Sequence, residues 1–311
     1  MLSLLGALLF YLTFGSQTAL YYSPMQGPLY SLATNLIKDN ITVVRLLTLA
    51  LLLGNGLLFN ELFKLFRIMP RRNFTILFFW LYYLLCFPVY LAFTPQLFAS
   101  VLMLYAIFLF FKFSSEESQI RDLISINLIF SFAALIYKPL IFYVVFVPIA
   151  LMLLRRFGLR YFVVSVLSFA LPFLYLWTWY FIKDEGSKFQ LLFDFRFTDL
   201  ESLTAPFHDY RFAIPFAGSA LIFFAGFQKM LFSIQSKLIQ TRIIVSFIMG
   251  FLLFNLLLVI FFPAEVKYSL FLLFFPSVAI QSMGFMELKK GWLLDIVLSV
   301  FLIVSLGLNY L

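Results

Sequence analysis

Long apolar runs recur along almost the whole chain, and a lipid bilayer is the environment that accommodates them. A hydrocarbon layer about 30 Å thick needs roughly 20 apolar residues per helix. Lipid offers the backbone no hydrogen-bond partners, so each run is expected to be a helix. With 64% hydrophobic and only 12% charged residues, the chain lies far outside the range of soluble domains. We therefore predict one all-α integral membrane domain over residues 1–311.

The runs divide into about eleven expected transmembrane spans with short connections. The first has neither a positively charged start nor a small-residue cleavage site, so it is interpreted as a retained helix and not as a signal peptide. Pro24, Gly27 and Pro28 interrupt the segment that follows, after which residues 29–37 favour a short helix at the membrane surface. The spans are expected at 2–20, 43–59, 74–93, 97–111, 123–136, 140–154, 162–182, 212–227, 243–262, 269–286 and 292–310.

Lysine and arginine are divided unequally between the two sets of connections. Fourteen of the 22 basic residues fall on one side of the expected bundle and eight on the other. The positive-inside rule places the richer side, together with the N-terminus, in the cytoplasm. Residues 183–211, the one long polar interruption, then form an outer loop. We predict a multi-pass membrane protein with its N-terminus in the cytoplasm.

Four charged residues on the expected outer side form a candidate site. Asp39 and Glu265 are candidates for a general base that takes a proton from an acceptor hydroxyl. Lys138, in a Lys-Pro turn, and Arg211 are candidates to hold a lipid phosphate as the leaving group. The alternative is that these residues are ordinary solvated charges or local ion pairs at the bilayer surface.

Several kinds of site are excluded by the composition. His208 is the single histidine and Cys86 the single cysteine, so histidine-ligated iron centres, zinc motifs and an intrachain disulfide are not available. We predict no metal and no cofactor. Because the basic residues are scattered between apolar segments, as membrane orientation requires, nucleic acid is not predicted as a partner.

A few amide and acidic residues fall inside the expected spans. Asn55, Asn127 and Asn255 are interpreted as amides that hydrogen-bond between closely packed helices. Asp295 lies one turn into the last span. It is interpreted as a carboxylate that reaches back to the cytoplasmic surface or pairs with a neighbouring lysine, and a role in an ion pathway is the alternative.

Two stretches resemble polytopic glycosyltransferases of the GT-C superfamily. They are ALIYKPLIF at 134–142, which runs on to LLRR at 153–156, and EVKYSL at 265–270, which is followed by Pro276. The first resembles a Lys-Pro hairpin of that superfamily and the second its late outer entry into a helix. Gln17 and Thr18 stand where such enzymes carry an acidic residue beside a tyrosine pair, so the usual base is missing there. The resemblance implies a GT-C-like fold that acts on a polyprenyl-phosphate sugar.

The chain is also similar, over most of its length, to a Bacteroidota family of inner-membrane proteins of unknown function. The similarity lies in the order of the spans, the hairpin at 123–156 and the segments 193–215 and 262–310. It implies a location in the inner membrane and names no reaction.

Two functions from different classes follow. The first is a protein of envelope glycoconjugate assembly, either a transferase dependent on a polyprenyl-phosphate sugar or a degenerate relative that binds the lipid-linked substrate. The second is a non-catalytic membrane scaffold whose outer loop docks other membrane protein subunits of an envelope or secretion complex. Membrane lipids are partners in both. An outer cavity in which Asp39 or Glu265 meets Lys138 and Arg211 would favour the first, and a flat outer loop would favour the second.

Overall fold

The fold is helical throughout the part of the chain that the computed structural model describes. The described residues are 20–21, 23–37, 40–70, 73–114, 120–195, 200–262, 266–286 and 292–310. Within these ranges the β-type pairing consists of isolated bridges between Leu20 and Phe93 and between Gln26 and Tyr137. The predicted all-α class is confirmed for these residues.

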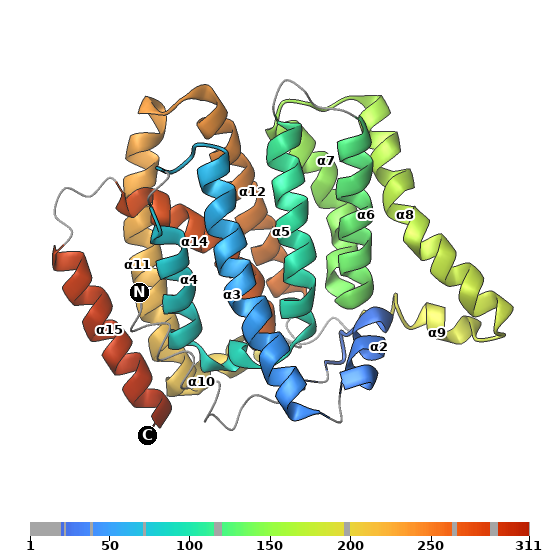
Figure 1. Cartoon of the computed structure of the whole chain (residues 1–311), viewed down its shortest axis with the longest axis horizontal. Helices are drawn as coiled ribbons and strands as arrows, with labels where there is room; N and C mark the ends of the chain where they lie inside the picture. Colours follow the sequence, from blue (N-terminus) through green and yellow to red (C-terminus); the bar gives the residue numbers. More distant parts are fainter. Residues whose placement is uncertain are drawn as a thin grey trace.

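The helices run back and forth between two edges of a bundle (Figure 1). In chain order they are α2 (Pro28–Ile37), α3 (Ile41–Leu65), α4 (Thr75–Cys86), η1 (Pro88–Leu91), α5 (Pro95–Phe113), α6 (Ile120–Ile136), η2 (Lys138–Phe142), α7 (Tyr143–Leu153), α8 (Leu159–Ile182), α9 (Gly186–Gln190), α10 (Leu200–His208), α11 (Tyr210–Ser233), η3 (Ile234–Ser236), α12 (Ile239–Phe261), α13 (Val266–Ser269), α14 (Phe271–Phe285) and α15 (Trp292–Tyr310).

Each edge of the bundle has its own character. Figure 1 shows α2, α9 and α10 together at one edge, which we call the α10 edge. The connections α3–α4, α5–α6, α7–α8 and α11–α12 lie at the opposite edge. We call this the basic edge because Arg67, Arg155, Arg156, Lys237 and Arg242 lie in or beside its connections. The structure thus separates the connections into the two sets that the sequence predicted.

Among the described residues, six helices are long and apolar enough to cross a membrane. They are Ile41–Leu65, Pro95–Phe113, Leu159–Ile182, Tyr210–Ser236, Ile239–Phe261 and Val266–Phe285, and shorter apolar helices lie at Thr75–Cys86, Lys138–Leu153 and Leu298–Leu308. The described residues therefore support a multi-pass membrane protein but not eleven full spans. The first expected span, 2–20, lies outside the described residues except for Leu20.

Proline and 3-10 turns shorten two of the expected spans. Helix α4 ends at Cys86, just before Pro88 opens η1, and α7 begins at Tyr143, after the turn that holds Pro139. Proline has no N–H to donate and restricts the residue before it, so these turns cannot continue a helix. At 1.5 Å per residue, the 12 residues of α4 cover about 18 Å of the 30 Å layer. The full span expected at 74–93 was therefore wrong, whereas the one expected at 140–154 corresponds to the shorter apolar helix Lys138–Leu153.

The segment before the first long described helix packs into the bundle. The helix expected at 29–37 is present as α2, but Tyr30 and Thr34 are buried and α2 contacts α6. The Tyr30 hydroxyl donates to the carbonyl of Phe93 at 2.8 Å. This helix closes part of the α10 edge, whereas the sequence predicted only a position at the membrane surface.

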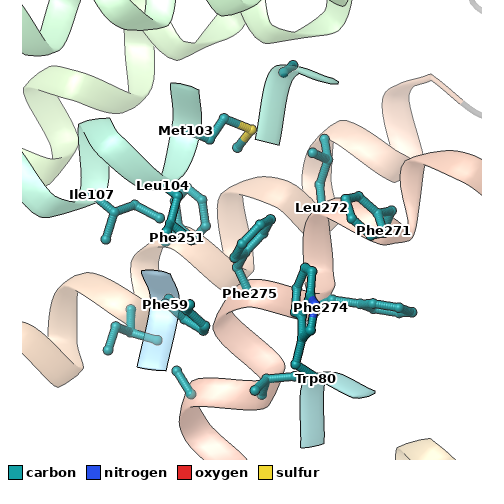
Figure 2. Packing of buried hydrophobic residues seen from close by; sticks show 14 of the residues in the cluster. Phe59, Trp80, Met103, Leu104, Ile107, Phe251, Phe271, Leu272, Phe274 and Phe275 are labelled. Atoms are coloured by element: carbon teal, nitrogen blue, oxygen red, sulfur yellow. The ribbon is translucent and has the colours of Figure 1, made fainter. Parts of the chain in front are cut away.

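Helix α14 is the central element of the bundle. All but two of its 15 residues are buried, and it contacts α4, α5, α11 and α12. Figure 2 shows aromatic rings of α14 between its neighbours. The ring centroid of Phe275 lies 5.4 Å from that of Phe59 on α3 and 4.9 Å from that of Trp80 on α4. Because lipid is as apolar as this interior, close packing of this kind holds the helices together.

Hydrogen bonds between buried side chains also join the helices. The amide of Asn55 on α3 donates to the Ser100 hydroxyl on α5 at 2.7 Å, and the Tyr143 hydroxyl on α7 donates to the Asn255 amide oxygen on α12 at 2.7 Å. These bonds confirm the interhelical role predicted for the two asparagines. Asn127 instead donates to a carbonyl one turn earlier in its own helix. The side chain of Asp295 lies outside the described residues.

Helices α11 and α14 make their closest approach at two glycines. A Cβ added to Gly284 would overlap the backbone oxygen of Gly226, and a Cβ on Gly226 would press on the backbone of Gln281. Small residues at a crossing allow backbones in a membrane to approach closely. The position of α11 on α14 therefore depends on this pair.

Replacing Gly284 with alanine is expected to destabilise the bundle by about 1–3 kcal/mol, because the added methyl group forces two packed helices apart. An unfolding titration in mixed micelles would measure the loss. Gly54→Ala is the matched control, since no atom lies within 4 Å of a Cβ there and alanine favours a helix. An equal response of the two variants would contradict the close crossing.

Candidate functional site

Helices α11 and α12 both pack on α14 and leave an opening between them. This opening, which we call the lateral pocket, has a volume of about 330 Å³. Phe216 and Phe224 of α11 form one wall, Leu252 and Leu256 of α12 form the other, and Phe274 of α14 lies among the lining residues. Phe224 and Leu256 are exposed, so the pocket is open sideways, where a bilayer would lie. Its volume falls at the lower end of the range for small-molecule sites.

Tyr90 lines the lateral pocket, and its buried hydroxyl has no partner among the described residues. The residue lies in η1 and is 2% exposed. Leaving a buried donor unmatched costs about 1–3 kcal/mol. A bound molecule with an oxygen acceptor would remove this cost.

A few charged residues lie near the end of the pocket closest to the α10 edge, outside its lining. The ring of Phe212 stacks 6.2 Å from that of Phe216, which lines the pocket, and Lys267 Nζ lies 5.6 Å from the Phe212 ring centroid. Lys267 Nζ is also 3.8 Å from Asp209 Oδ2. The backbone N–H of Arg211 donates to the other carboxylate oxygen at 3.0 Å, and its side chain is exposed. Lys267 therefore pairs with Asp209 near this end of the pocket, while the Arg211 guanidinium contacts the ring and hydroxyl of its neighbour Tyr210.

Lys138 lies in a different part of the α10 edge, where it holds the outer loop. Its Nζ donates to the carbonyl of Leu191 at 2.9 Å. Partial burial lowers the pKa of the amine, and the nearby carboxylate of Asp194 opposes that shift. Lys138 and Arg211 share no hydrogen-bond or ion-pair partner in the described part of the chain. These contacts assign Lys138 a tethering role, and its role in phosphate binding stays a prediction.

The other predicted site residues are not placed with these two. Asp39 and Glu265 lie outside the described residues, so their role as a general base also stays a prediction. His208 is exposed at the end of α10. Among the described residues, no group of three or more His, Cys, Asp or Glu side chains could hold a metal ion.

Two residues of the lateral pocket and its rim had no role in the sequence predictions. Tyr90 sits in an apolar run, and its only local sign was Pro88, which marks a turn. Lys267 was part of the EVKYSL stretch but was counted as an ordinary outer charge. Nothing in the local sequence shows that helices α11, α12 and α14 place these residues around one pocket.

A second and larger hollow lies at the basic edge. It has a volume of about 1280 Å³ and is lined by α3, α5 and the α3–α4 connection. Leu58 and Leu65 of α3 and Tyr105 of α5 are exposed apolar residues along it. We call it the basic-edge groove. Its lining includes Glu61 and Arg67 at the end of α3.

The chain matches no family model, and no curated protein or solved structure is detectably similar to it. The resemblances to GT-C glycosyltransferases and to a Bacteroidota membrane family therefore stay predictions from the sequence. What the site can do must be argued from its own geometry.

Lys138→Met is expected to loosen residues 191–195 from the bundle, because it removes the hydrogen bond to Leu191. A net bond energy of about 1 kcal/mol corresponds to roughly fivefold faster amide hydrogen exchange in that stretch. Lys188→Met is the control, since among the described residues Lys188 pairs with Glu185, which immediately precedes its own short helix. Unchanged exchange at 191–195 would show that Lys138 is not a tether.

Proposed function

We propose that this chain is an inner-membrane protein of envelope glycoconjugate assembly that binds a polyprenyl-phosphate-linked substrate at its outer face. In this proposal the basic edge and the N-terminus face the cytoplasm, as the positive-inside rule requires. The lateral pocket then opens into the outer leaflet. The observation that carries the proposal is this apolar pocket, open toward lipid, with Tyr90 and its unpartnered hydroxyl in the lining and the cation Lys267 near one end.

The chemistry of the lateral pocket matches the two ends of such a lipid. Phenylalanine and leucine walls suit an isoprenoid chain, which forms no hydrogen bonds. Arg211 and Lys267 would hold the phosphate through charge-assisted hydrogen bonds, with Asp209 keeping Lys267 at the rim. The Tyr90 hydroxyl would donate to a phosphate or sugar oxygen near the same end. The ligand would thus satisfy a donor that the described residues leave unmatched.

The proposal has a catalytic and a non-catalytic form. In the catalytic form a carboxylate, with Asp39 and Glu265 as the candidates, takes the proton of an acceptor hydroxyl. The acceptor oxygen forms a bond to the anomeric carbon while the bond from that carbon to the phosphate oxygen breaks, and polyprenyl phosphate leaves with the electron pair. The GT-C resemblance supports this form. In the non-catalytic form the same pocket holds the lipid-linked substrate without a base.

Tyr90→Phe is expected to leave the stability of the ligand-free protein unchanged or raise it by about 1 kcal/mol, because it removes an unmatched buried hydroxyl. The same variant should retain about tenfold less polyprenyl-phosphate lipid, as measured by native mass spectrometry of protein purified gently from its own membranes.

Tyr82→Phe is the control for this experiment, since it also removes a buried tyrosine hydroxyl, and Tyr82 does not line the lateral pocket. Wild-type protein that carries no polyprenyl-phosphate species would contradict the proposal. So would a Tyr90→Phe protein that keeps the full amount of lipid.

A membrane scaffold is the second candidate, and helix α8 favours it. Figure 1 shows the end of α8 nearest α9 standing apart from the other helices. Tyr175, Trp177 and Phe181 are exposed there. An aromatic, unpartnered helix end at the membrane surface suits either the lipid interface or another membrane subunit.

A photo-crosslinking residue at Tyr175 is expected to give mainly lipid adducts in native membranes if lipid binding is the function. The same residue at Leu167, which is exposed nearer the middle of α8, serves as the control. A single protein adduct at Tyr175 but not at Leu167, together with purified protein that carries no polyprenyl-phosphate species, would make the scaffold the better account.

A further inference from the structure

The basic-edge groove differs from the lateral pocket in both its position and its charge. Helices α3 and α5 lie side by side, and the groove runs along them toward the α3–α4 connection (Figure 1). From Leu58 to the end of α3 at Leu65 it covers about 10 Å, and the connection extends it to the surface. The hydrocarbon of one leaflet is about 15 Å deep. The groove therefore fits the depth of a single leaflet.

The charges at the end of this groove leave an excess of one cation. Lys64 Nζ lies 2.8 Å from Glu61 Oε1 and 3.9 Å from the ring centroid of Phe74, and its side chain is 10% exposed. This pair neutralises the single carboxylate of the groove. Arg67 is exposed, and no ion pair within the described part of the chain involves it. Its guanidinium can form two parallel hydrogen bonds to a phosphate.

The backbone at Arg67 is also unusual. Its φ of 54° lies in the left-handed region, where glycine is favoured, and its N–H donates to the carbonyl of Lys64 as α3 ends. A glycine would close the helix with less strain than this arginine. Arg155, which follows α7 at the same edge, has a φ of 57° and does not line the groove.

We propose that the basic-edge groove is a binding site for an anionic glycerophospholipid of the leaflet at this edge. The acyl chains lie along the apolar walls of α3 and α5, where Leu58 and Tyr105 are exposed. The phosphate accepts hydrogen bonds from Arg67 at the surface. Zwitterionic lipids have the same acyl chains, but a cation in their head group compensates the phosphate charge. The positive charge of Arg67, which has no ion pair among the described residues, therefore favours an anionic head group. The site is separate from the lateral pocket and does not rest on its proposed ligand.

Native mass spectrometry of the full chain in mild detergent, titrated with phosphatidylglycerol or phosphatidylcholine of the same acyl chains, tests this site. The wild type is expected to bind phosphatidylglycerol more tightly. Arg67→Gly relieves the backbone and removes the charge, so it should weaken phosphatidylglycerol binding about tenfold and leave phosphatidylcholine binding within about twofold. Arg67→Lys should keep part of the preference. Arg155→Gly is the matched control, because Arg155 has a similar positive φ, the same charge and a place at the same edge. It should leave both affinities unchanged.

Three results would overturn the proposal. The first is a wild type with no preference between the two lipids, and the second is an equal loss of affinity in Arg67→Gly and Arg155→Gly. The third is a protein adduct of a photo-crosslinking residue placed at Tyr105. An adduct with a peptide of this chain or of another protein would show that protein, and not lipid, occupies the groove. A lipid adduct at Tyr105 that is lost in a Val101→Trp background, which fills the groove, would support the site.

Discussion

The packing of several helices on α14 is the interaction on which the rest of the structure depends. Nearly all of α14 is buried, and two glycines let α11 approach it at backbone distance. Helix α12 packs on the same central element, and α11 and α12 leave the lateral pocket between them. In lipid, where apolar burial supplies little driving force between helices, such close contacts and buried hydrogen bonds determine which surfaces meet. The pocket is therefore a consequence of how the core is built.

Two hollows of similar physical design open from the sides of the bundle. Both have apolar walls; the basic-edge groove has Lys64 and Arg67 in its lining, and the lateral pocket has Lys267 near one end. At the α10 edge Lys267 and Arg211 stand beside Asp209, and at the basic edge Arg67 stands beside the Lys64–Glu61 pair. A molecule with a long apolar chain and an anionic head matches both arrangements. This shared design makes lipid recognition the simplest account of the described residues.

The fold class and the two sets of connections were predictable from the sequence, because lipid requires helices and the basic residues are unequally divided. The hydrogen bonds that Asn55 and Asn255 make between helices were also predictable, because a polar side chain within a membrane bundle needs a partner. The lengths of α4 and α7 could not be predicted, because apolar composition alone does not show where a 3-10 turn begins. The lateral pocket was also beyond the sequence: Tyr90 and Lys267 come together through the packing of helices that are far apart in the chain. Lys138 looked available for a phosphate, but it holds a carbonyl 53 residues away.

The central claim is that the lateral pocket holds a lipid with an anionic head. Cryo-electron microscopy of the protein in nanodiscs made from its native membrane lipids tests this claim most directly. The account predicts continuous, chain-like density between α11 and α12 over α14, ending in a head group within hydrogen-bond distance of Arg211, Lys267 and Tyr90. Direct packing of α11 on α12 with the pocket closed, or an open pocket without such density, would contradict it.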